Sequence, residues 1–351
     1  MEKYWEIFVN GYSNYADYVW KEITFQVTPL WKNYFWMLIL VSGFFFVLEI
    51  ARPWREKQPR FRKDFWLDFF YMFFNFFLFS LLIYNASSDV LVNLLNDGIL
   101  ALTSFNLKAS NPLYGWPLWG VLLTGFVFRD FIQWWIHRLL HRLPRLWEFH
   151  KVHHSVEQMG FAAHLRYHWM ENIVYRSIEY IPLALIGIGL HDFFLIHIFT
   201  LAWGHYNHAN LHVSGRVTGG IAFGLLGLLV ASTGFDLNWQ YDALAGLGGA
   251  LLGALVIGPY MKYIFNSPEM HIWHHAYELP KERRTGVNFG LTLAIWDFLW
   301  KTNYIPHDGR DIRLGFPGIE TFPHSFISQN THGFRDIDNE DQEAKIDEIG
   351  S

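Results

Sequence analysis

Histidines occur in four short clusters, and their spacing is the strongest chemical signal in the chain. The four segments read HRLLH, HKVHH, HANLH and HIWHH. Residues three or four positions apart share one face of a helix, so each cluster presents two or three imidazoles side by side. Repeated clusters of this kind predict a metal site, since histidine is the commonest metal ligand. They supply ten imidazoles: His137, His141, His150, His153, His154, His208, His212, His271, His274 and His275.

Ten nitrogen donors are more than one metal ion takes. A zinc site is usually four-coordinate, so two metal ions that share the set are the simplest interpretation. Imidazole suits Fe, Cu, Zn and Ni alike, and the ligand type alone leaves the metal open. Three further histidines lie near the clusters and are candidates to bind a metal or to support a ligand: His164, His168 and His205.

Carboxylates near the clusters are candidates to orient the imidazoles, because a metal-bound imidazole usually donates its other N–H to an acceptor. Asp130 lies seven residues before His137, two helical turns away on the same face. We predict that it accepts the distal N–H of a ligand imidazole, with an ion pair to a neighbouring arginine as the alternative. Glu171 and Asp297 are weaker candidates for the same role.

The chain is too apolar for an ordinary soluble fold, so we expect membrane helices to carry the histidines. Of its 351 residues, 52% are hydrophobic and only 17% are charged. Runs of about 20 apolar residues can cross a bilayer. We therefore predict an all-α, polytopic membrane helical bundle. The predicted spans are 34–51, 69–88 and 109–128, followed by one hairpin at 180–203 and a second that joins 217–235 to 243–261.

Basic residues indicate the orientation of this bundle. Six cations lie between Arg52 and Lys63, and further arginines surround the first two histidine clusters. The positive-inside rule places both regions in the cytoplasm, so the histidine-rich metal site is expected on the cytoplasmic side. The chain is predicted to be a multi-pass integral membrane protein, in a bacterial inner membrane or, in a eukaryote, in the endoplasmic reticulum.

Three regions are expected along the chain. An N-terminal segment with the first transmembrane hairpin covers 1–108, the catalytic region covers 109–305, and a polar tail covers 306–351 with an acidic end that is predicted to be disordered. A glycine-rich hairpin at about 216–257 interrupts the catalytic region and contains no histidine. The run from Gly215 to Gly258 holds 11 glycines, which lets two membrane helices approach closely.

Composition also excludes several classes of function. The chain has no cysteine, so iron–sulfur clusters, thiolate-ligated haem and disulfides are excluded. The net charge is −5, and the basic residues form short clusters between apolar runs. A nucleic-acid partner is therefore not expected.

The four clusters, with NFG at 288–290 and WDFLWKT at 296–302, resemble the fatty acid hydroxylase and sterol desaturase superfamily. The resemblance covers about residues 110–305. It implies a membrane enzyme in which two iron ions and O2 oxidise a lipid, with the ten clustered histidines as the metal ligands. Asn210, inside the HANLH segment, is predicted with Asp130 to act in catalysis.

Hydroxylation of an unactivated C–H bond is the expected reaction, with desaturation at the same site as the alternative. The lipid is predicted to be a fatty acyl chain, a sterol or a related molecule. Electrons must come from a separate donor, of ferredoxin or cytochrome b5 type with its reductase, because the chain has no dinucleotide fingerprint. A zinc hydrolase, a haem-bearing electron carrier and a metal transporter are the competing interpretations.

Overall fold

A computed structural model describes residues 2–106, 109–235 and 238–335, and their regular elements are helical. Two isolated bridges, Phe265 to Leu293 and Ala276 to Leu314, are the only β-type pairings among these residues. The α-helices are α1 Glu2–Ile23, α2 Tyr34–Ala51, α3 Phe65–Phe73, α4 Asn85–Thr103, α5 Leu118–Arg142, α6 Pro144–His154, α7 Trp169–Leu185, α8 Leu190–His208, α9 Gly215–Gly234, α10 Trp239–Leu252, α11 Met261–Ile264, α12 Pro268–His274, α13 Ile295–Leu299 and α14 Phe326–His332. The prediction of an all-helical fold is confirmed.

Four helical segments are long and apolar enough to cross a membrane: Tyr34–Ala51, Phe65–Leu82, Gly215–Gly234 and Trp239–Ile264. They agree with four of the predicted spans. The segment predicted at 109–128 is not among them, because α5 begins at Leu118 and carries the buried Arg129 and Asp130 in its middle. The predicted hairpin at 180–203 is the junction of α7 and α8, and neither helix is among the four candidates.

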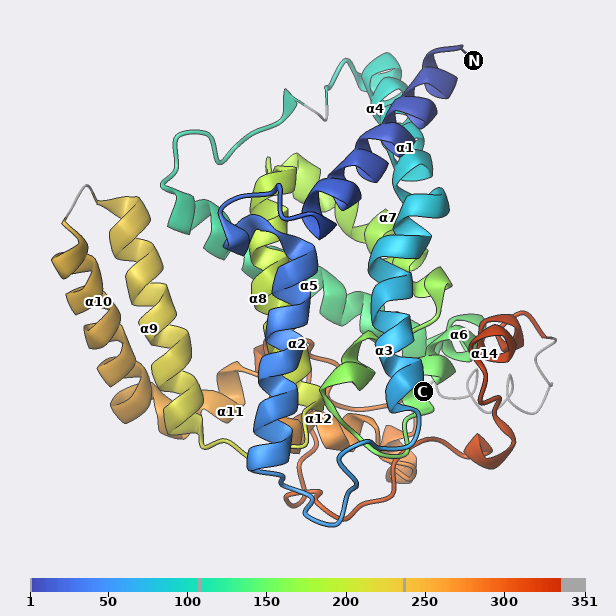
Figure 1. The fold of residues 1–351 in the computed structure, drawn as a ribbon, viewed down its shortest axis with the longest axis vertical. Helices are drawn as coiled ribbons and strands as arrows, with labels where there is room; N and C mark the ends of the chain where they lie inside the picture. Colours follow the sequence, from blue (N-terminus) through green and yellow to red (C-terminus); the bar gives the residue numbers. More distant parts are fainter. Residues whose placement is uncertain (1, 107–108, 236–237, 336–351) are drawn as a thin grey trace.

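The helices converge at one end of the molecule, where the histidine-bearing segments meet (Figure 1). Helices α2 and α3 stand roughly upright, and α12 lies beneath α2. Helix α5 packs against α6, α7 and α8, and α12 packs against α8. These contacts bring the last turn of α5, all of α6, the last turn of α8 and the short α12 to a common region.

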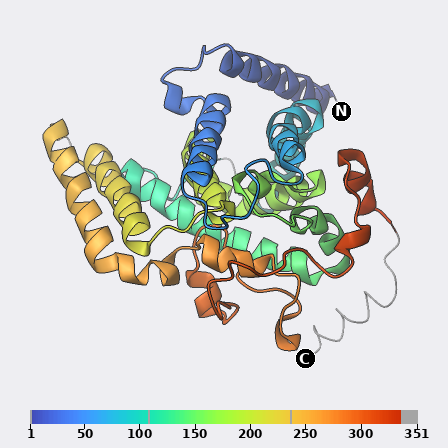
Figure 2. The same ribbon diagram turned by 60° about the horizontal axis from the view of Figure 1, so that its bottom comes forward.

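Helices α9 and α10 form a hairpin that leans away from the other helices (Figure 2). Glycine allows this pair to pack backbone against backbone. A Cβ atom added at Gly219 would lie 2.4 Å from the carbonyl oxygen of Gly253, and one at Gly227 would lie 2.4 Å from that of Ala245. The outward side carries exposed apolar side chains such as Leu225 and Leu247, as a helix pair in contact with lipid requires.

The tight helix contact in this hairpin predicts different effects for two glycine substitutions. Gly219→Ala should lower the melting temperature of the detergent-solubilised protein, because its methyl group has no room and overpacking costs about 1–3 kcal/mol. Gly248→Ala is the matched control, since nothing lies within 4 Å of its Cβ position. It should leave the melting temperature unchanged or raise it slightly, as alanine favours the helix. Equal effects of the two substitutions would contradict the tight contact.

Candidate metal centre

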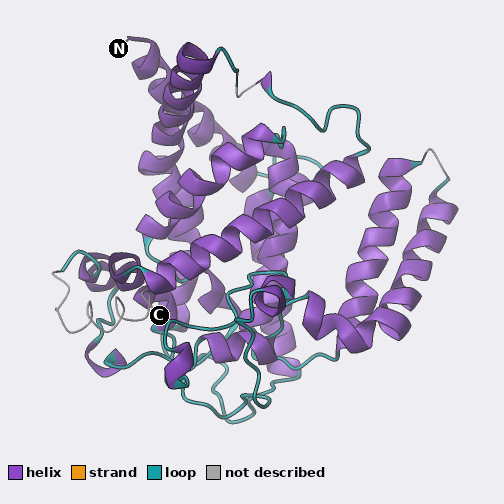
Figure 3. Cartoon of the chain, turned by 180° about the vertical axis from the view of Figure 1, so that it is seen from behind, coloured by secondary structure: helices purple, strands orange, loops and turns teal. Residues whose placement is uncertain are grey.

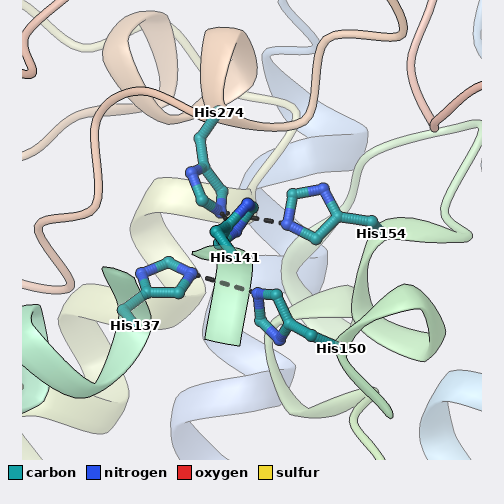
Figure 4. A group of neighbouring side chains, drawn as sticks. All are labelled: His137, His141, His150, His154 and His274. Atoms are coloured by element: carbon teal, nitrogen blue, oxygen red, sulfur yellow. Dashed lines mark hydrogen bonds between the residues drawn. The ribbon is translucent and has the colours of Figure 1, made fainter. Parts of the chain in front are cut away.

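Nine of the ten clustered histidines meet in two adjoining groups. One group holds five rings, His137, His141, His150, His154 and His274, and the other holds four, His153, His208, His271 and His275. In each group, one ring nitrogen per histidine lies within 4.8 Å of all the others. All nine side chains are buried. Figure 4 shows the first group, whose rings point toward a common centre.

Helical spacing explains how each segment contributes to the groups. His137 and His141 are one turn apart near the end of α5, and both belong to the first group. In α6 and at the end of α12, adjacent histidines are divided between the groups: His154 and His274 face the first, whereas His153 and His275 face the second. Since neighbouring helical residues point about 100° apart, each HH pair serves two centres. The pairs His153–His154 and His274–His275 therefore link the five-ring group to the four-ring group.

The outer nitrogen of several rings is tied to a fixed acceptor. His137 Nδ1 lies 2.8 Å from the carbonyl oxygen of Phe289, and His274 Nδ1 lies 2.7 Å from that of Val287. In the second group, His208 Nδ1 lies 2.8 Å from the carbonyl oxygen of Gly204. A carbonyl oxygen can only accept, so each of these nitrogens must carry the proton. The inner Nε2 atoms of these rings are then unprotonated.

His150 and His153 follow the same pattern with other acceptors. His150 Nδ1 lies 2.9 Å from Glu171 Oε2, and His153 Nδ1 lies 3.1 Å from the carbonyl oxygen of Arg166. The predicted role of Glu171 as an orienting carboxylate agrees with this contact. Burial lowers the pKa of His153 to about 3 and that of His154 well below its usual value. The rings are therefore neutral near pH 7, which is the form that binds metal.

The inner nitrogens face each other at short distances. His137 Nε2 lies 3.2 Å from His150 Nε2, and in the second group His208 Nε2 lies 3.3 Å from His153 Nε2. Both atoms of each pair carry a lone pair directed at the other, because both protons are on Nδ1. Two lone pairs in a buried site repel unless a cation lies between them. The arrangement therefore fits a metal ion at the centre of each group.

The distances themselves fit metal coordination. Metal–imidazole bonds of about 2.0–2.1 Å, at the angles of tetrahedral or octahedral sites, separate adjacent nitrogens by roughly 2.9–3.4 Å. The closest Nε2 pairs are 2.9 Å apart for His271 with His208 and 3.1 Å apart for His154 with His274. A set made only of imidazoles suits Fe, Cu, Zn or Ni.

Asp130 does not hold a ligand imidazole, which corrects the sequence-based expectation. Its carboxylate accepts hydrogen bonds from the backbone N–H of Thr292 at 3.1 Å, the backbone N–H of Leu293 at 3.2 Å and the indole Nε1 of Trp296 at 2.9 Å. The partner of His137 is instead the carbonyl of Phe289. Asp130 therefore anchors the segment that follows the orienting carbonyls.

Asp297 anchors the same segment from its other side. Its buried carboxylate accepts from the backbone N–H groups of Phe289 and Gly290, at 2.9 and 2.8 Å, and from Trp134 Nε1 at 3.0 Å. These bonds fix the NFG turn, whose Asn288 has a positive φ of 54°. The sequence showed the NFG and WD motifs, but it could not show which groups accept the Nδ1–H of the histidines. Those acceptors are backbone carbonyls, which any residue type carries.

His212 and Asn210 lie outside both groups. The His212 side chain is 53% exposed, and its Nε2 lies 2.6 Å from Glu269. It follows the end of α8 at His208, so helical spacing no longer places it on the face of His208. Asn210 accepts from the backbone N–H of Arg55 at 2.7 Å and donates to the carbonyl of the same residue at 3.2 Å. Its side chain thus fixes the loop after α2.

The three neighbouring histidines occupy different surroundings. His164 has its ring centroid 5.2 Å from that of His208, and its Nδ1 lies 3.1 Å from Nδ1 of His205. His205 Nε2 lies 2.9 Å from the hydroxyl of Ser42. His168 Nε2 lies 2.9 Å from the carbonyl of Asn330 in α14. Residues 326–335 of the predicted tail therefore pack into the fold, whereas its acidic end lies outside the described residues.

Comparisons with known proteins place this arrangement among lipid-modifying enzymes. The family model described as fatty acid hydroxylase matches residues 122–302, which is more than half of the chain. A curated relative, ornithine lipid hydroxylase OlsE of Rhizobium tropici, is 26% identical over 203 residues, which cover 58% of this chain and 47% of that protein. The match thus spans about half the length of the relative. No solved structure matches the chain.

The division of the histidines predicts which substitutions lower metal content. His208→Ala should reduce the bound metal from about two ions per chain toward one, because His208 lies within the four-ring group. His212→Ala, in the same sequence cluster, should retain both ions. Metal analysis of the purified variants measures the difference. If His212→Ala lost metal and His208→Ala did not, His212 would be the metal ligand of the HANLH cluster.

Proposed function

Since the chain belongs to the fatty acid hydroxylase family, we propose that it is a membrane enzyme that uses two iron ions and O2 to hydroxylate a C–H bond of a lipid. The observation that supports this most directly is the pair of adjoining imidazole groups, in which five rings have Nδ1 against an acceptor and Nε2 turned inward. Two metal ions held this close can act on one substrate. The proposed iron ligands are the nine grouped histidines.

Iron is proposed because the chemistry needs a metal that changes oxidation state. No amino-acid side chain oxidises an unactivated C–H bond, so the oxidising power must come from a cofactor. Zinc has no redox chemistry. When bound, the two iron ions would supply electron transfer to O2 and oxidation of the C–H bond.

The overall reaction balances with two electrons from outside the chain. A lipid C–H bond, O2, two electrons and two protons give a C–OH group and one water molecule. The chain has no cysteine and no dinucleotide fingerprint, so the electrons are proposed to come from a separate protein of ferredoxin or cytochrome b5 type. Desaturation would use the same electrons and release two water molecules.

The protein's own residues hold the ligands and exclude water. The carbonyls of Val287 and Phe289 fix the proton on Nδ1 of their histidines, so that Nε2 stays available to metal. Asp130 and Asp297 keep these carbonyls in place through the backbone N–H groups of the same segment. We propose both aspartates as positioning residues, and Asn210 as a residue that positions the loop beside α8.

A membrane lipid is the proposed substrate class. The relative from Rhizobium tropici is named as an ornithine lipid hydroxylase, and the family is named for fatty acids. Four helices of this chain are apolar enough to lie in the bilayer that holds such molecules. We propose that the lipid reaches the histidine groups from the membrane.

Isotopic labelling tests the proposed reaction. Cells that express the chain should contain a lipid with one additional oxygen atom, and that atom should carry the label when the cells are grown under oxygen-18 gas. Cells that express His274→Ala are the control and should lack the product, because this ring lies in the five-histidine group. A product that lacks two hydrogen atoms and carries no label would instead establish desaturation.

The proposed orientation, with the metal groups on the cytoplasmic side, predicts which positions an impermeant thiol reagent reaches. Gln26 and Lys57 are both exposed and flank the opposite ends of the candidate span α2, and Lys57 lies in the loop whose Arg55 hydrogen-bonds to Asn210, two residues after His208. In the cysteine-free chain, Gln26→Cys should be labelled on intact cells, and Lys57→Cys only after the cells are opened. The reverse pattern would place the metal groups on the outer side.

A further inference from the structure

Arg138 is held by aromatic rings rather than by an ion pair, and the Asp297 carboxylate attracts it only through space. It lies on α5 and is only 8% exposed, yet within the described residues no hydrogen bond or ion pair involves its guanidinium, and its Nε is buried without a partner. The group instead stacks against two indole rings, 4.7 Å from the centroid of Trp134 and 4.9 Å from that of Trp135. The oxygens of Asp297 already accept hydrogen bonds from Phe289, Gly290 and Trp134, so the guanidinium can bind a further anion.

An apolar groove of about 440 Å³ lies on the same flank of α5. Its walls are side chains of α5 and of the segment around α13: Leu123, Thr124, Val127, Phe128, Phe131, Trp296 and Trp300. The groove is open to the surroundings, and several wall residues are exposed, including Leu123, Val127 and Trp300. Helix α5 crosses the front of the molecule in the view of Figure 3.

Helical geometry joins the groove to the arginine. Thr124, Val127, Phe131 and Arg138 are spaced by three, four and seven residues, so they form one stripe along α5. At 1.5 Å per residue, Arg138 lies roughly 10 Å beyond Phe131. Trp300 connects the two, with its ring centroid 5.5 Å from Phe131 and 6.2 Å from Trp135.

We propose that this stripe binds one bilayer lipid with an anionic headgroup, its acyl chain in the groove and its head on Arg138. An arginine on a stack of tryptophans suits a phosphate group, and tryptophan is enriched where the headgroups of a bilayer lie. The groove walls are apolar, as an acyl chain requires. An acyl chain suits the groove better than a soluble peptide does, because its walls are apolar and exposed in a chain that has four other helices apolar enough to cross a bilayer.

This lipid site is distinct from the metal groups. His137 and His141 point into the five-ring group, whereas Arg138 points about 100° from His137 and about 60° from His141 around the helix axis and stacks on Trp134 and Trp135. The bound lipid would therefore lie against the outer flank of the helix that carries two metal ligands. Its binding is independent of the reaction proposed above, and its test needs no turnover.

Native mass spectrometry of the detergent-purified, metal-loaded protein tests the site. The probes are phosphatidylglycerol and phosphatidylcholine with the same acyl chains, added in equal amounts. The wild-type protein should retain phosphatidylglycerol preferentially. Arg138→Gln should lower this preference by about tenfold, as expected for the loss of a charge-assisted hydrogen bond. Val127→Trp should fill the groove and reduce retention of both lipids.

Two matched controls separate the site from general attraction to the surface. Arg142→Gln removes an exposed arginine one turn further along α5, and Leu225→Trp adds a tryptophan to the exposed face of α9. Both should bind the lipids as the wild type does, and metal content should be unchanged in all variants. An effect of Arg142→Gln equal to that of Arg138→Gln would overturn the proposal.

Two further results would also overturn it. Unchanged phosphatidylglycerol binding by both Arg138→Gln and Val127→Trp would exclude the site, and so would displacement of this lipid by inorganic phosphate alone, because the acyl chain would then contribute nothing. If Arg138→Gln does not fold, Arg138→Lys provides the test. It keeps the charge and should retain part of the preference, while Val127→Trp still reports on the groove.

Discussion

Repulsion between unprotonated imidazole nitrogens is the constraint on which the rest of this structure depends. Nine buried rings turn their Nε2 atoms toward two centres, at separations such as the 3.2 Å between His141 and His274. Without positive charge, the lone pairs of the five rings whose Nδ1 lies against an acceptor would repel one another. In the proposed metal-bound protein, the packing of α5, α6, α8 and α12 is coupled to metal binding, because the ions would supply the attraction that the protein atoms lack. Folding energy and metal affinity are parts of one equilibrium.

A second set of interactions makes this arrangement specific. Each outer nitrogen needs an acceptor, and the chain supplies backbone carbonyls from a segment that is itself irregular. That segment has only an isolated bridge to Phe265 and no extended sheet, so the carboxylates of Asp130 and Asp297 add hydrogen bonds to its backbone. The two aspartates act at a distance from the metal, through the backbone they fix.

Sequence patterns predicted the helical class and the position of the metal groups, because helical spacing of histidines is a local property. They failed where the outcome depends on distant parts of the chain. Asp130 has the right spacing to meet His137, yet its oxygens are taken by residues more than 160 positions away. His212 has the right spacing to accompany His208, but α8 ends between them. The span predicted at 109–128 differs from the observed helix α5, Leu118–Arg142, for a similar reason. Asp130 and Arg129 in α5 form hydrogen bonds to distant parts of the chain.

The position of the α9–α10 hairpin has a consequence for biosynthesis. The hairpin separates His208 from His271, which are 63 residues apart and face each other at 2.9 Å. At about 5–20 residues per second, a ribosome needs roughly 3–13 s to make the intervening chain. During that interval the membrane must accept two further helices while His153 and His208 await their partners from α12. If the second group holds a metal ion as proposed, its site is complete only after α12 has been made, so that ion would be loaded after the hairpin has been synthesised.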